Sequence, residues 1–234
     1  MEILAIIPAR GGSKGIARKN LKDVGGKPLV VHTIEASLNS KYITKTIVST
    51  EDQEIAEVSK SFGAQVVSRP NELAQDETKT APVMLDVVKK LEKEGYKPDY
   101  IVLLQPTCPL RDAKYIDDAF DFFFEMEKQG YDSCFSGFDC GTTHALWKIS
   151  HGVKAHPLYD FRKRPRRQEI NQHYSLISEN GAFYALSLEK FLQYEDFIAH
   201  NPCIYLTERV VDIDTEDDLK VIAQELSARD KKNV

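Results

Sequence analysis

The sequence predicts an α/β fold in which a mainly parallel sheet is flanked by helices. Short apolar runs alternate with amphipathic segments through the first 130 residues. The apolar runs lack polar alternation, as strands buried on both faces do, and such strands are typical of parallel sheets covered by helices. The first run ends abruptly in a glycine-rich, basic loop, and in parallel sheets ligands bind beyond the carboxyl ends of the strands.

Each element of the first half follows from a local pattern. Pro28 suits the first turn of a helix, and Gly63 suits the end of another. The runs predict strands at 3–7, 46–49, 64–67 and 100–104, and amphipathic helices near 28–39, 51–62, 80–94 and 112–129.

The region from about 138 to 180 breaks this rhythm, because it is rich in His, Arg, Tyr and Pro and contains the basic run 162–167. A long structureless loop inside a compact domain is uncommon and often functional. The region is therefore either a disordered loop or an excursion that closes over the site or over a partner subunit.

Regular patterning returns in the C-terminal part of the chain. Apolar runs lie at 182–186 and 203–206, and a last strand is expected at 210–213. A helix follows from about 215, where Thr215 and Asp218 have the spacing of an N-cap residue and its acidic partner.

Length and charge narrow the function classes. A chain of 234 residues with 42% hydrophobic and 29% charged residues fits one α/β domain over 1–234. The net charge of −5 disfavours a general nucleic-acid binder. No apolar run approaches the roughly 18 residues that span a membrane, and the short N-terminal run ends in Pro8, so a cytoplasmic protein is expected. The four cysteines show no metal-ligand spacing and are expected to be reduced thiols.

The loop after the first strand is the sharpest local signal. Its three glycines permit close backbone approach to a ligand, and Arg10 and Lys14 back the free amides with positive charge. Arg18, Lys19 and Lys22 continue the cation density, so a polyphosphate is expected here. A tight surface turn is the alternative interpretation of the loop alone. The P-loop and dinucleotide-binding patterns are both absent.

Asp212 and Asp214 form the second signal. In a strand, residues two apart share a face, so the two carboxylates would point together while Ile213 faces the core. Paired carboxylates suit Mg²⁺, which takes one or two carboxylates together with substrate phosphates. A solvated acidic strand end is the alternative. Combined with the basic loop, the pair indicates metal-assisted chemistry on a nucleotide phosphate.

Ordered motifs across nearly the whole chain carry a family resemblance. They are IPARGGSKGI at 7–16, KN at 19–20, IVST at 47–50, LLQPTCPLR at 103–111, NGAFY at 180–184 and DIDTEDDL at 212–219. This set resembles the acylneuraminate cytidylyltransferases (CMP-sialic acid synthetases), which join CTP and a nonulosonic acid into a CMP-sugar and pyrophosphate. The resemblance implies a Rossmann-like fold, a Mg²⁺ cofactor, and a homodimer in which 138–180 is an inserted segment for dimerisation and the sugar pocket.

The resemblance also implies roles for individual residues. The nucleotide-binding set is Ala9, Arg10, Gly11, Gly12, Ser13, Lys14, Lys19, Asn20, Arg69 and Thr80. The substrate-binding set is Gln105, Arg111 and Arg167, and the metal-binding pair is Asp212 and Asp214. The catalytic set is Arg10, Lys19, Asp212 and Asp214, with Asp212 as a metal ligand, a general base or both.

One departure from the family pattern concerns the sugar. The link between Arg167 and Asn180 is longer than is usual in the family. N-acetylneuraminic acid is the first candidate, and legionaminic acid or another nonulosonic acid is the alternative. A Kdo cytidylyltransferase, a hexose-1-phosphate nucleotidyltransferase and a non-catalytic nucleotide-binding module are the other hypotheses.

Overall fold

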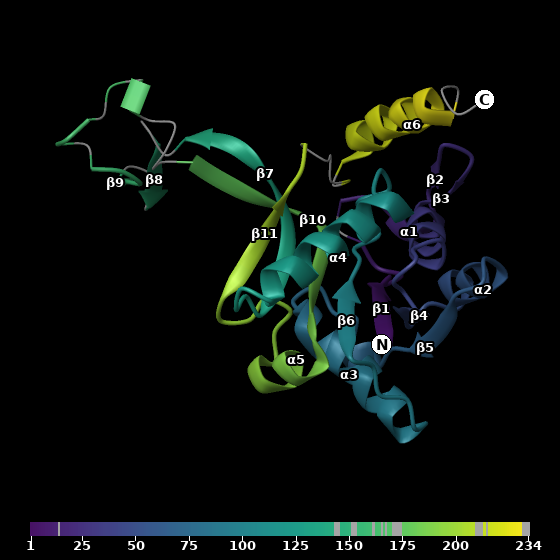
Figure 1. The fold of residues 1–234 in the computed structure, drawn as a ribbon. Helices are drawn as coiled ribbons and strands as arrows, with labels where there is room; N and C mark the ends of the chain where they lie inside the picture. Colours follow the sequence, from purple (N-terminus) through teal and green to yellow (C-terminus); the bar gives the residue numbers. More distant parts are fainter. Residues whose placement is uncertain are drawn as a thin grey trace.

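A seven-stranded sheet forms the centre of the computed structural model (Figure 1). The structure describes all residues except 14, 143–145, 151–153, 161, 165, 167, 170–174, 209–212, 214 and 231–234, and the side chains of 142, 175, 229 and 230 are also outside the description. The strand order is β11 (Pro202–Leu206), β7 (Ser133–Thr142), β10 (Ser175–Ser187), β6 (Tyr100–Leu103), β1 (Ile3–Pro8), β4 (Lys45–Thr50) and β5 (Gln65–Ser68).

The strands of the N-terminal half are parallel, as predicted. β1 pairs with β4 and β6, and β4 pairs with β5, all in parallel register. β10 is antiparallel to both β6 and β7, whereas β11 is parallel to β7. The predicted mainly parallel α/β fold is confirmed, and the carboxyl ends of β1, β4 and β6 lie at one edge of the sheet.

Helices cover both faces of the sheet because the strands are apolar on both sides. Ile3, Ala5 and Ile7 of β1 join one buried cluster with residues of α1 and α4, whereas Leu4 and Ile6 join a second cluster with residues of α3 and α5. The helices are α1 (Leu29–Leu38), α2 (Gln53–Ser61), α3 (Thr80–Lys93), α4 (Ala113–Glu127), α5 (Leu188–Tyr194) and α6 (Glu216–Asp230).

A third apolar cluster attaches α6 to the loop after β1. Ile16, Leu110 and Ile213 are buried together with Leu219 and Ile222 of α6. The predicted cap of this helix is confirmed, because the Thr215 hydroxyl accepts a hydrogen bond from the Asp218 amide at 3.2 Å, and the Asp218 carboxylate accepts one from the Thr215 amide at 2.8 Å.

The predicted elements of the first half are confirmed to within a residue or two at each end. Gly63 follows α2 with φ +92°, the left-handed conformation expected after a helix. Of the last strand expected at 210–213, residues 210–212 lie outside the described part, and Ile213 is not in a strand. Two short strands, β2 (Asp23–Val24) and β3 (Lys27–Pro28), and two 3-10 helices, η1 (Lys19–Leu21) and η2 (Asn71–Leu73), complete the body.

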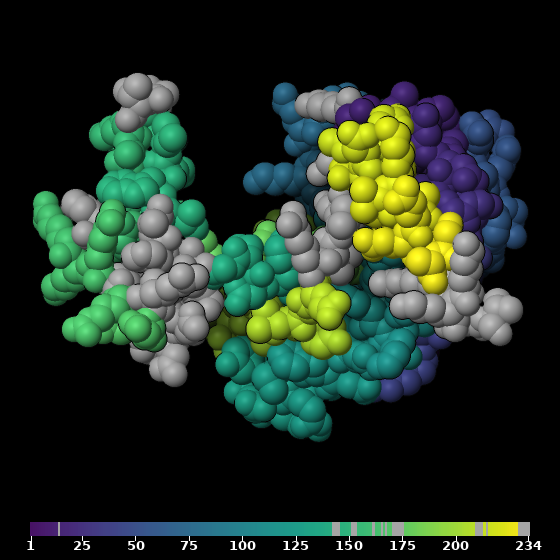
Figure 2. Space-filling view, turned by 90° about the horizontal axis from the view of Figure 1, so that it is seen from above, coloured from purple at the N-terminus to yellow at the C-terminus, as the bar shows by residue number. Residues whose placement is uncertain are grey.

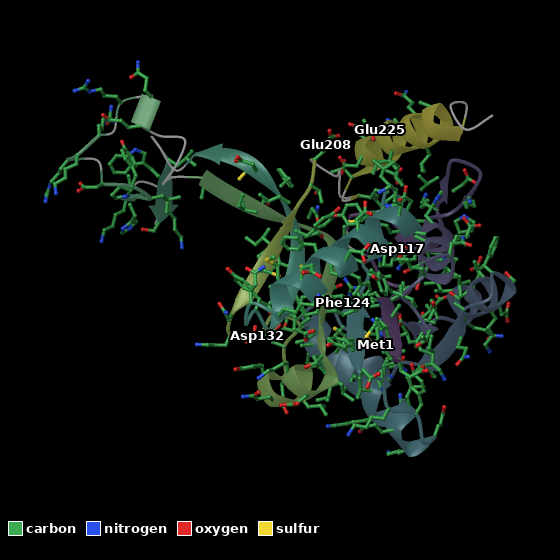
Figure 3. All side chains as sticks on the ribbon, in the orientation of Figure 1. Met1, Asp117, Phe124, Asp132, Glu208 and Glu225 are labelled. Carbon is green, nitrogen blue, oxygen red and sulfur yellow. The ribbon has the colours of Figure 1, made fainter. Side chains whose placement is uncertain are left out.

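We use the term arm for the described residues between 138 and 179, which are the end of β7, the start of β10 and, between them, the hairpin of β8 (Trp147–Ser150) and β9 (Lys154–Pro157) with the residues that follow it. β8 and β9 pair only with each other, in a separate two-stranded sheet. Figure 2 shows the arm as a lobe that stands away from the rest of the molecule, and in Figure 3 its side chains fan outward. The described part of 138–180 thus contains regular strands, and its roles in dimerisation and sugar binding stay predictions.

Two further expectations concern cysteines and membranes. Cys108, Cys134, Cys140 and Cys203 are free thiols, and Cys134 and Cys203 lie opposite each other in the β7–β11 register. Across the described ranges, no helix combines the length and the apolar character that crossing a bilayer requires.

Candidate active site

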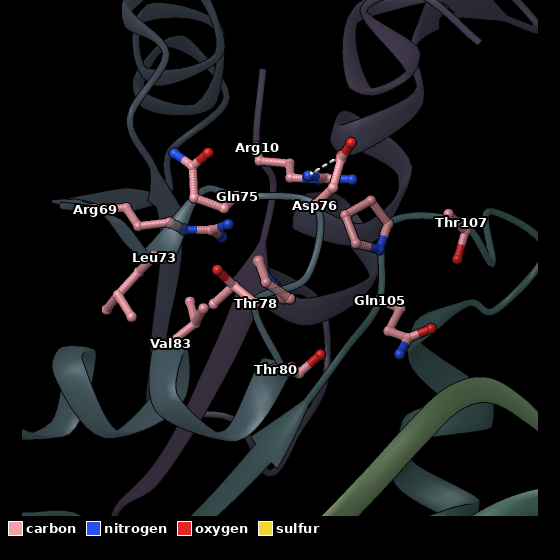
Figure 4. Close-up of a pocket in the computed structure, with 12 residues that line it drawn as sticks. Arg10, Arg69, Leu73, Gln75, Asp76, Thr78, Thr80, Val83, Gln105 and Thr107 are labelled. Atoms are coloured by element: carbon pink, nitrogen blue, oxygen red, sulfur yellow. Dashed lines mark ion pairs between the residues drawn. The ribbon is translucent and has the colours of Figure 1, made fainter. Parts of the chain in front are cut away.

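Two adjoining cavities open at the carboxyl ends of β1 and β6. They share Pro8, Arg10, Pro106 and Thr107 in their walls, so they form one continuous cleft. The first, of about 220 Å³, is otherwise lined by residues between 69 and 83 and by Gln105 (Figure 4). The second, of about 330 Å³, is otherwise lined by Gly12, Ser13, Gly15, Lys19 and Asn20.

The glycine-rich loop after β1 is fastened to its neighbours by hydrogen bonds. The Ala9 amide donates to the Ser49 carbonyl oxygen at 3.0 Å, and the Asn20 side chain donates to the Arg10 carbonyl oxygen at 2.9 Å. The Gly11 amide donates to Oε1 of Glu51 at 2.7 Å. These hydrogen bonds to Ser49, Asn20 and Glu51 fix the backbone of the loop, and Gly12 and Ser13 line the second cavity.

Gly11 is required by a close approach. A Cβ at this position would lie 2.5 Å from Oδ2 of Asp52, well inside van der Waals contact. Asp52 cannot move away easily, because its Oδ1 accepts hydrogen bonds from the Ile55 amide at 3.0 Å and from Arg18 at 3.0 Å. The N-cap of α2 thus packs against the loop, and Arg18 points toward this carboxylate.

Arg10 spans the cleft to the loop that follows β5. Its guanidinium group forms an ion pair with Asp76 at 2.6 Å and donates to the Ala74 carbonyl oxygen at 3.3 Å (Figure 4). The side chain is partly exposed, and it belongs to the walls of both cavities. Arg10 therefore lies at the boundary between the two cavities, where it would contact a ligand that extends from one cavity into the other.

Arg69 is a buried cation at the first cavity. It is 5% exposed and donates to the Ser49 hydroxyl at 3.2 Å and to the Ser49 carbonyl oxygen at 2.6 Å. Burial lowers the pKa of Arg69, and the negative charge of Glu51 partly opposes that effect. Thr80 begins α3 and also lines this cavity. The first cavity thus combines a cationic wall with hydroxyl and amide groups.

Lys19 links the second cavity to the segment before α6. Its ammonium group donates to the Ile213 carbonyl oxygen at 2.6 Å, and the Ile213 amide donates to the Thr107 carbonyl oxygen at 3.1 Å. Ile213 is fully buried. These contacts join the first quarter of the sequence to its last part, so the chain returns to the cleft between β11 and α6.

Comparison with known proteins decides the family. The sequence profile described as Cytidylyltransferase matches residues 4–207 of this chain. The chain belongs to the cytidylyltransferase family. The prediction of a nucleotidyltransferase of the cytidylyltransferase type is therefore confirmed.

Relatives and solved structures agree with this family. The pseudaminic acid cytidylyltransferase of Campylobacter jejuni subsp. jejuni serotype O:2 is 30% identical over 224 residues, which are 94% of each chain. The N-acylneuraminate cytidylyltransferase of Escherichia coli O18:K1:H7 is 28% identical over 236 residues, 98% of this chain and 54% of the relative, so this chain spans about half of that protein. The structure of a CMP:2-keto-3-deoxy-manno-octonic acid synthetase complexed with CTP has a TM-score of 0.73 at 16% identity, covering 98% of this chain and 100% of that chain, which shows a shared fold.

The cleft of this cytidylyltransferase brings together most of the described residues that the sequence assigned to the nucleotide. Lys14, Arg167, Asp212 and Asp214 lie outside the described residues, so their assignments stay predictions. The predicted nucleotide and substrate residues that line the cleft are Arg10, Gly12, Ser13, Lys19, Asn20, Arg69, Thr80 and Gln105. Ala9 and Gly11 lie behind this lining, where they hold the loop to β4 and to Glu51.

Arg111, which was expected to bind the substrate, is buried and is not among the residues that line the two cavities. It is 1% exposed, and its guanidinium group donates to the carbonyl oxygens of Gln105 at 3.2 Å and Ala182 at 2.9 Å and to the Thr33 hydroxyl at 2.6 Å. Burial lowers the pKa of Arg111 to about 10. Protein groups therefore enclose this cation, an environment that fits a role in holding backbone, and its role in substrate binding stays a prediction.

Sequence reasoning missed Glu51, Asp76 and Gly181 as residues that shape the cleft. The signal for Glu51 was available, because it directly follows β4, whose carboxyl end lies at the ligand-binding edge. The contacts of Asp76 and Gly181 depend on long-range packing with Arg10 and Gln105, which no local pattern indicates.

Proposed function

We propose that this cytidylyltransferase joins CTP and a nonulosonic acid into a CMP-sugar and pyrophosphate. The observation that carries the proposal is the pair of cavities that share Arg10, one built around the glycine-rich loop and the other around Arg69 and Thr80. In the reaction, the anomeric hydroxyl oxygen forms a bond to the α-phosphorus, and the bond to the oxygen bridging the α- and β-phosphates breaks. The hydroxyl proton passes to a base, and pyrophosphate leaves with the bridging oxygen.

The residues present favour a defined placement of CTP. Gly12 and Ser13 border the second cavity with Lys19, so backbone and ammonium groups surround the place proposed for the triphosphate. The first cavity, with Arg69 and Thr80, is then the place for the cytidine part. Arg10 would leave the Asp76 carboxylate to offset charge that develops on the leaving pyrophosphate.

Mg²⁺ fits the donor set next to Ile213. The Ile213 backbone is bonded to Lys19 and to Thr107, both in the wall of the second cavity, and its sequence neighbours are Asp212 and Asp214. Carboxylate oxygens are hard ligands of the kind that Mg²⁺ prefers. When bound, the ion would neutralise phosphate charge and polarise the α-phosphate. We therefore expect Asp212→Asn and Asp214→Asn each to lose Mg²⁺ binding in calorimetry and to lose turnover, with an unchanged circular dichroism spectrum.

N-acetylneuraminic acid is the proposed sugar, with Arg167 as the partner of its carboxylate and Gln105 as a second contact. Gln105 lines the first cavity directly before Pro106 and Thr107, which line both cavities. Relatives named N-acylneuraminate cytidylyltransferase align over most of this chain, for example that of Oncorhynchus mykiss at 33% identity over 229 residues. Legionaminic acid is the second candidate, because the CMP-N,N'-diacetyllegionaminic acid synthase of Legionella pneumophila is 40% identical over 120 residues. The longer link before Asn180 also favours a sugar other than N-acetylneuraminic acid.

The arm suggests a homodimer. Its hairpin leaves Trp147, Ile149 and Leu158 exposed by 40%, 67% and 50%. Apolar side chains gathered on a projecting hairpin are typical of an interaction surface. We propose that a second copy of the chain covers them.

The test of the proposed function is pyrophosphate release with each of the four nucleoside triphosphates and a sugar panel. The panel contains N-acetylneuraminic, legionaminic and pseudaminic acids, Kdo, and a hexose 1-phosphate. Turnover that needs both CTP and a nonulosonic acid supports the proposal, and the fastest acid identifies the sugar. Turnover with Kdo or hexose 1-phosphate alone, or none with any pair, contradicts it.

A further inference from the structure

The Gln105 side chain lies against a glycine on a neighbouring strand. Gly181 of β10 has φ +70°, and a Cβ built on it would lie 2.5 Å from Oε1 of Gln105 and 3.4 Å from its Cδ. The Cys108 sulfur would be 3.5 Å away on the other side. The carboxamide of Gln105 thus occupies the space that a side chain at position 181 would fill.

An irregularity in β10 brings Gly181 to this place. The β10–β7 register pairs Glu179 with Gly137 and Tyr184 with Phe135, so β10 contains more residues than β7 between these two pairs. The extra residues interrupt the ladder with β7, and one of them, Gly181, lies against Gln105 and Cys108, which follow β6. Bulges of this kind commonly re-aim side chains next to active sites.

Asn180 fixes the bulge through all four hydrogen-bonding positions of its side chain. Its Oδ1 accepts from the Ser136 hydroxyl at 2.6 Å and from the Ala182 amide at 3.1 Å. Its Nδ2 donates to the Tyr115 hydroxyl at 3.2 Å and to the Thr207 hydroxyl at 3.1 Å. A buried amide satisfied in this way holds the bulge in one conformation.

Arg111 ties the two sides of this contact together. The same guanidinium nitrogen donates to the carbonyl oxygen of Gln105 and to that of Ala182, the residue after Gly181. The acceptors that Arg111 reaches in the described part of the chain are two carbonyl oxygens and the Thr33 hydroxyl, all of them neutral, and its Nε has no hydrogen-bond partner there. Burying a cation among neutral groups is costly, so these contacts point to a positional role.

We propose that Gly181 and Arg111 are positioning residues that set the place of the Gln105 carboxamide in the cleft and thereby determine how well the sugar acid binds. Gly181 leaves room for the carboxamide, and Arg111 fixes the backbone on which it stands. The inference rests on the proposed function, since it assumes that Gln105 contacts the sugar.

Gly181→Ala is the first test. The new methyl group displaces the carboxamide, and because a misplacement of about 1 Å can cost roughly 100-fold, we expect a rise in KM of that order for the sugar acid that the wild-type protein turns over fastest. The dissociation constant of CTP, measured by calorimetry, stays at the wild-type value. An unchanged KM for the sugar acid would overturn the proposal.

Gly130→Ala is the matched control. Gly130 also has a positive φ, +95°, but no atom lies within 4 Å of the place where its Cβ would be. The substitution therefore adds comparable backbone strain without displacing a neighbour, and we expect wild-type kinetics. A rise in sugar KM equal to that of Gly181→Ala would show that backbone strain alone is the cause.

A double-mutant cycle decides whether the effect passes through Gln105. In the Gln105→Ala background, Gly181→Ala has no carboxamide left to displace, so we expect no further change in sugar KM. Arg111→Lys keeps the charge but cannot span three acceptors, and we expect it to raise sugar KM in the same non-additive way if it folds. Additive effects in the Gly181 cycle contradict the proposal.

A crystal structure of Gly181→Ala separates this inference from the proposed function. A displaced Gln105 side chain supports the positioning role even if no sugar in the panel is turned over, in which case only the proposed function fails. A Gln105 side chain in its wild-type place overturns the inference even if the wild-type protein makes CMP-sugar.

Discussion

The body of the molecule and its arm bury apolar residues to very different extents. Ile3 and Ile7 of β1 are 0% exposed, and helices cover both faces of their sheet. In the arm, Ile149 is 67% exposed, and all four residues of β9 are exposed. The body therefore contains its own core, whereas the arm hairpin presents apolar side chains that nothing in the described chain covers.

This difference separates two kinds of function. The residues that line the cleft in the described part of the chain all belong to the body, where Arg10, Arg69 and Lys19 are fixed by contacts to neighbouring strands and loops. The arm has no comparable internal support, so its apolar residues are more useful as a surface for a partner. Variants in the body should change stability or chemistry at any protein concentration, and variants in the arm should act through assembly.

The largest expected effect comes from a core aromatic residue. Phe120 is 0% exposed and contacts the rings of Phe183 at 5.0 Å and Phe124 at 5.6 Å. Phe120→Ala should lower the free energy of unfolding by roughly 3–5 kcal/mol, because it leaves a cavity in the body. Trp147→Ala removes an arm ring that is 40% exposed and meets the Tyr159 ring edge to face, and should cost about 1 kcal/mol.

Chemical denaturation with both variants at low protein concentration measures this difference. Equal losses would show that the arm is as strongly packed within one chain as the body, and the comparison would fail.

The next effect concerns chemistry in the body. Lys19→Met removes one of the cations of the second cavity and its hydrogen bond to Ile213 while keeping a similar apolar stem. Loss of one such electrostatic group should lower kcat/KM by about 100-fold or more, equally at low and high protein concentration. Lys114→Met is the control, because Lys114 is 79% exposed on α4, pairs with Asp118 at 2.6 Å and lies outside the walls of both cavities. A loss that disappears at high protein concentration would place Lys19 in assembly instead.

The body was also the part that the sequence predicted well. β1, β4, β5 and β6 are continuous apolar runs, and their pattern depends only on burial between two helical layers. The arm and the strand before it could not be assigned in the same way. β7 and β10 pair over a long antiparallel ladder with irregular register. The part of each strand within the body is mostly buried, whereas the part within the arm is partly or fully exposed.

The same division holds for the site. Arg10, Lys19 and Asn20 were predicted because glycines and cations cluster within one loop of the sequence. Glu51, Asp76 and Gly181 act through partners 40, 66 and 76 residues away, as the contacts of Gly11, Arg10 and Gln105 show. Arg111 belongs to the motif at 103–111 that predicted ligand binding, but its side chain is buried. Motifs identify which residues gather at a site, and packing decides which of them face the ligand.

An arm variant gives the third effect. Ile149→Asp places a carboxylate on the exposed face of β8, which should weaken association of two copies while leaving the unfolding of each chain nearly unchanged. Sedimentation velocity measures the shift from dimer to monomer. Val221→Asp is the control, since Val221 is 46% exposed on α6 in the body. A wild-type protein that is monomeric, or a variant that stays dimeric, would remove the arm from the proposed interface.

The smallest effect compares a buried histidine of the body with an exposed one of the arm. His32 in α1 is 9% exposed, and its Nε2 lies 2.7 Å from the Val24 carbonyl oxygen. Burial lowers the pKa of His32 below its ordinary value, and the hydrogen bond to Val24 and the charges of Glu35 and Asp23 oppose this only partly, while Lys27 adds to it.

Because the unfolded chain binds the proton more tightly at this position, the neutral His32 stabilises the fold above the ordinary pKa of about 6.5, and that contribution is lost as the pH falls through the lower folded value. We expect the Tm of the wild-type protein to drop more steeply between about pH 7 and pH 5 than that of His32→Gln. His156→Gln makes the same substitution at an exposed residue of the arm and is the matched control. Parallel Tm profiles for wild type and His32→Gln would mean that the body does not hold this histidine in its neutral form. The difference in burial between body and arm would then not affect the protonation of their histidines.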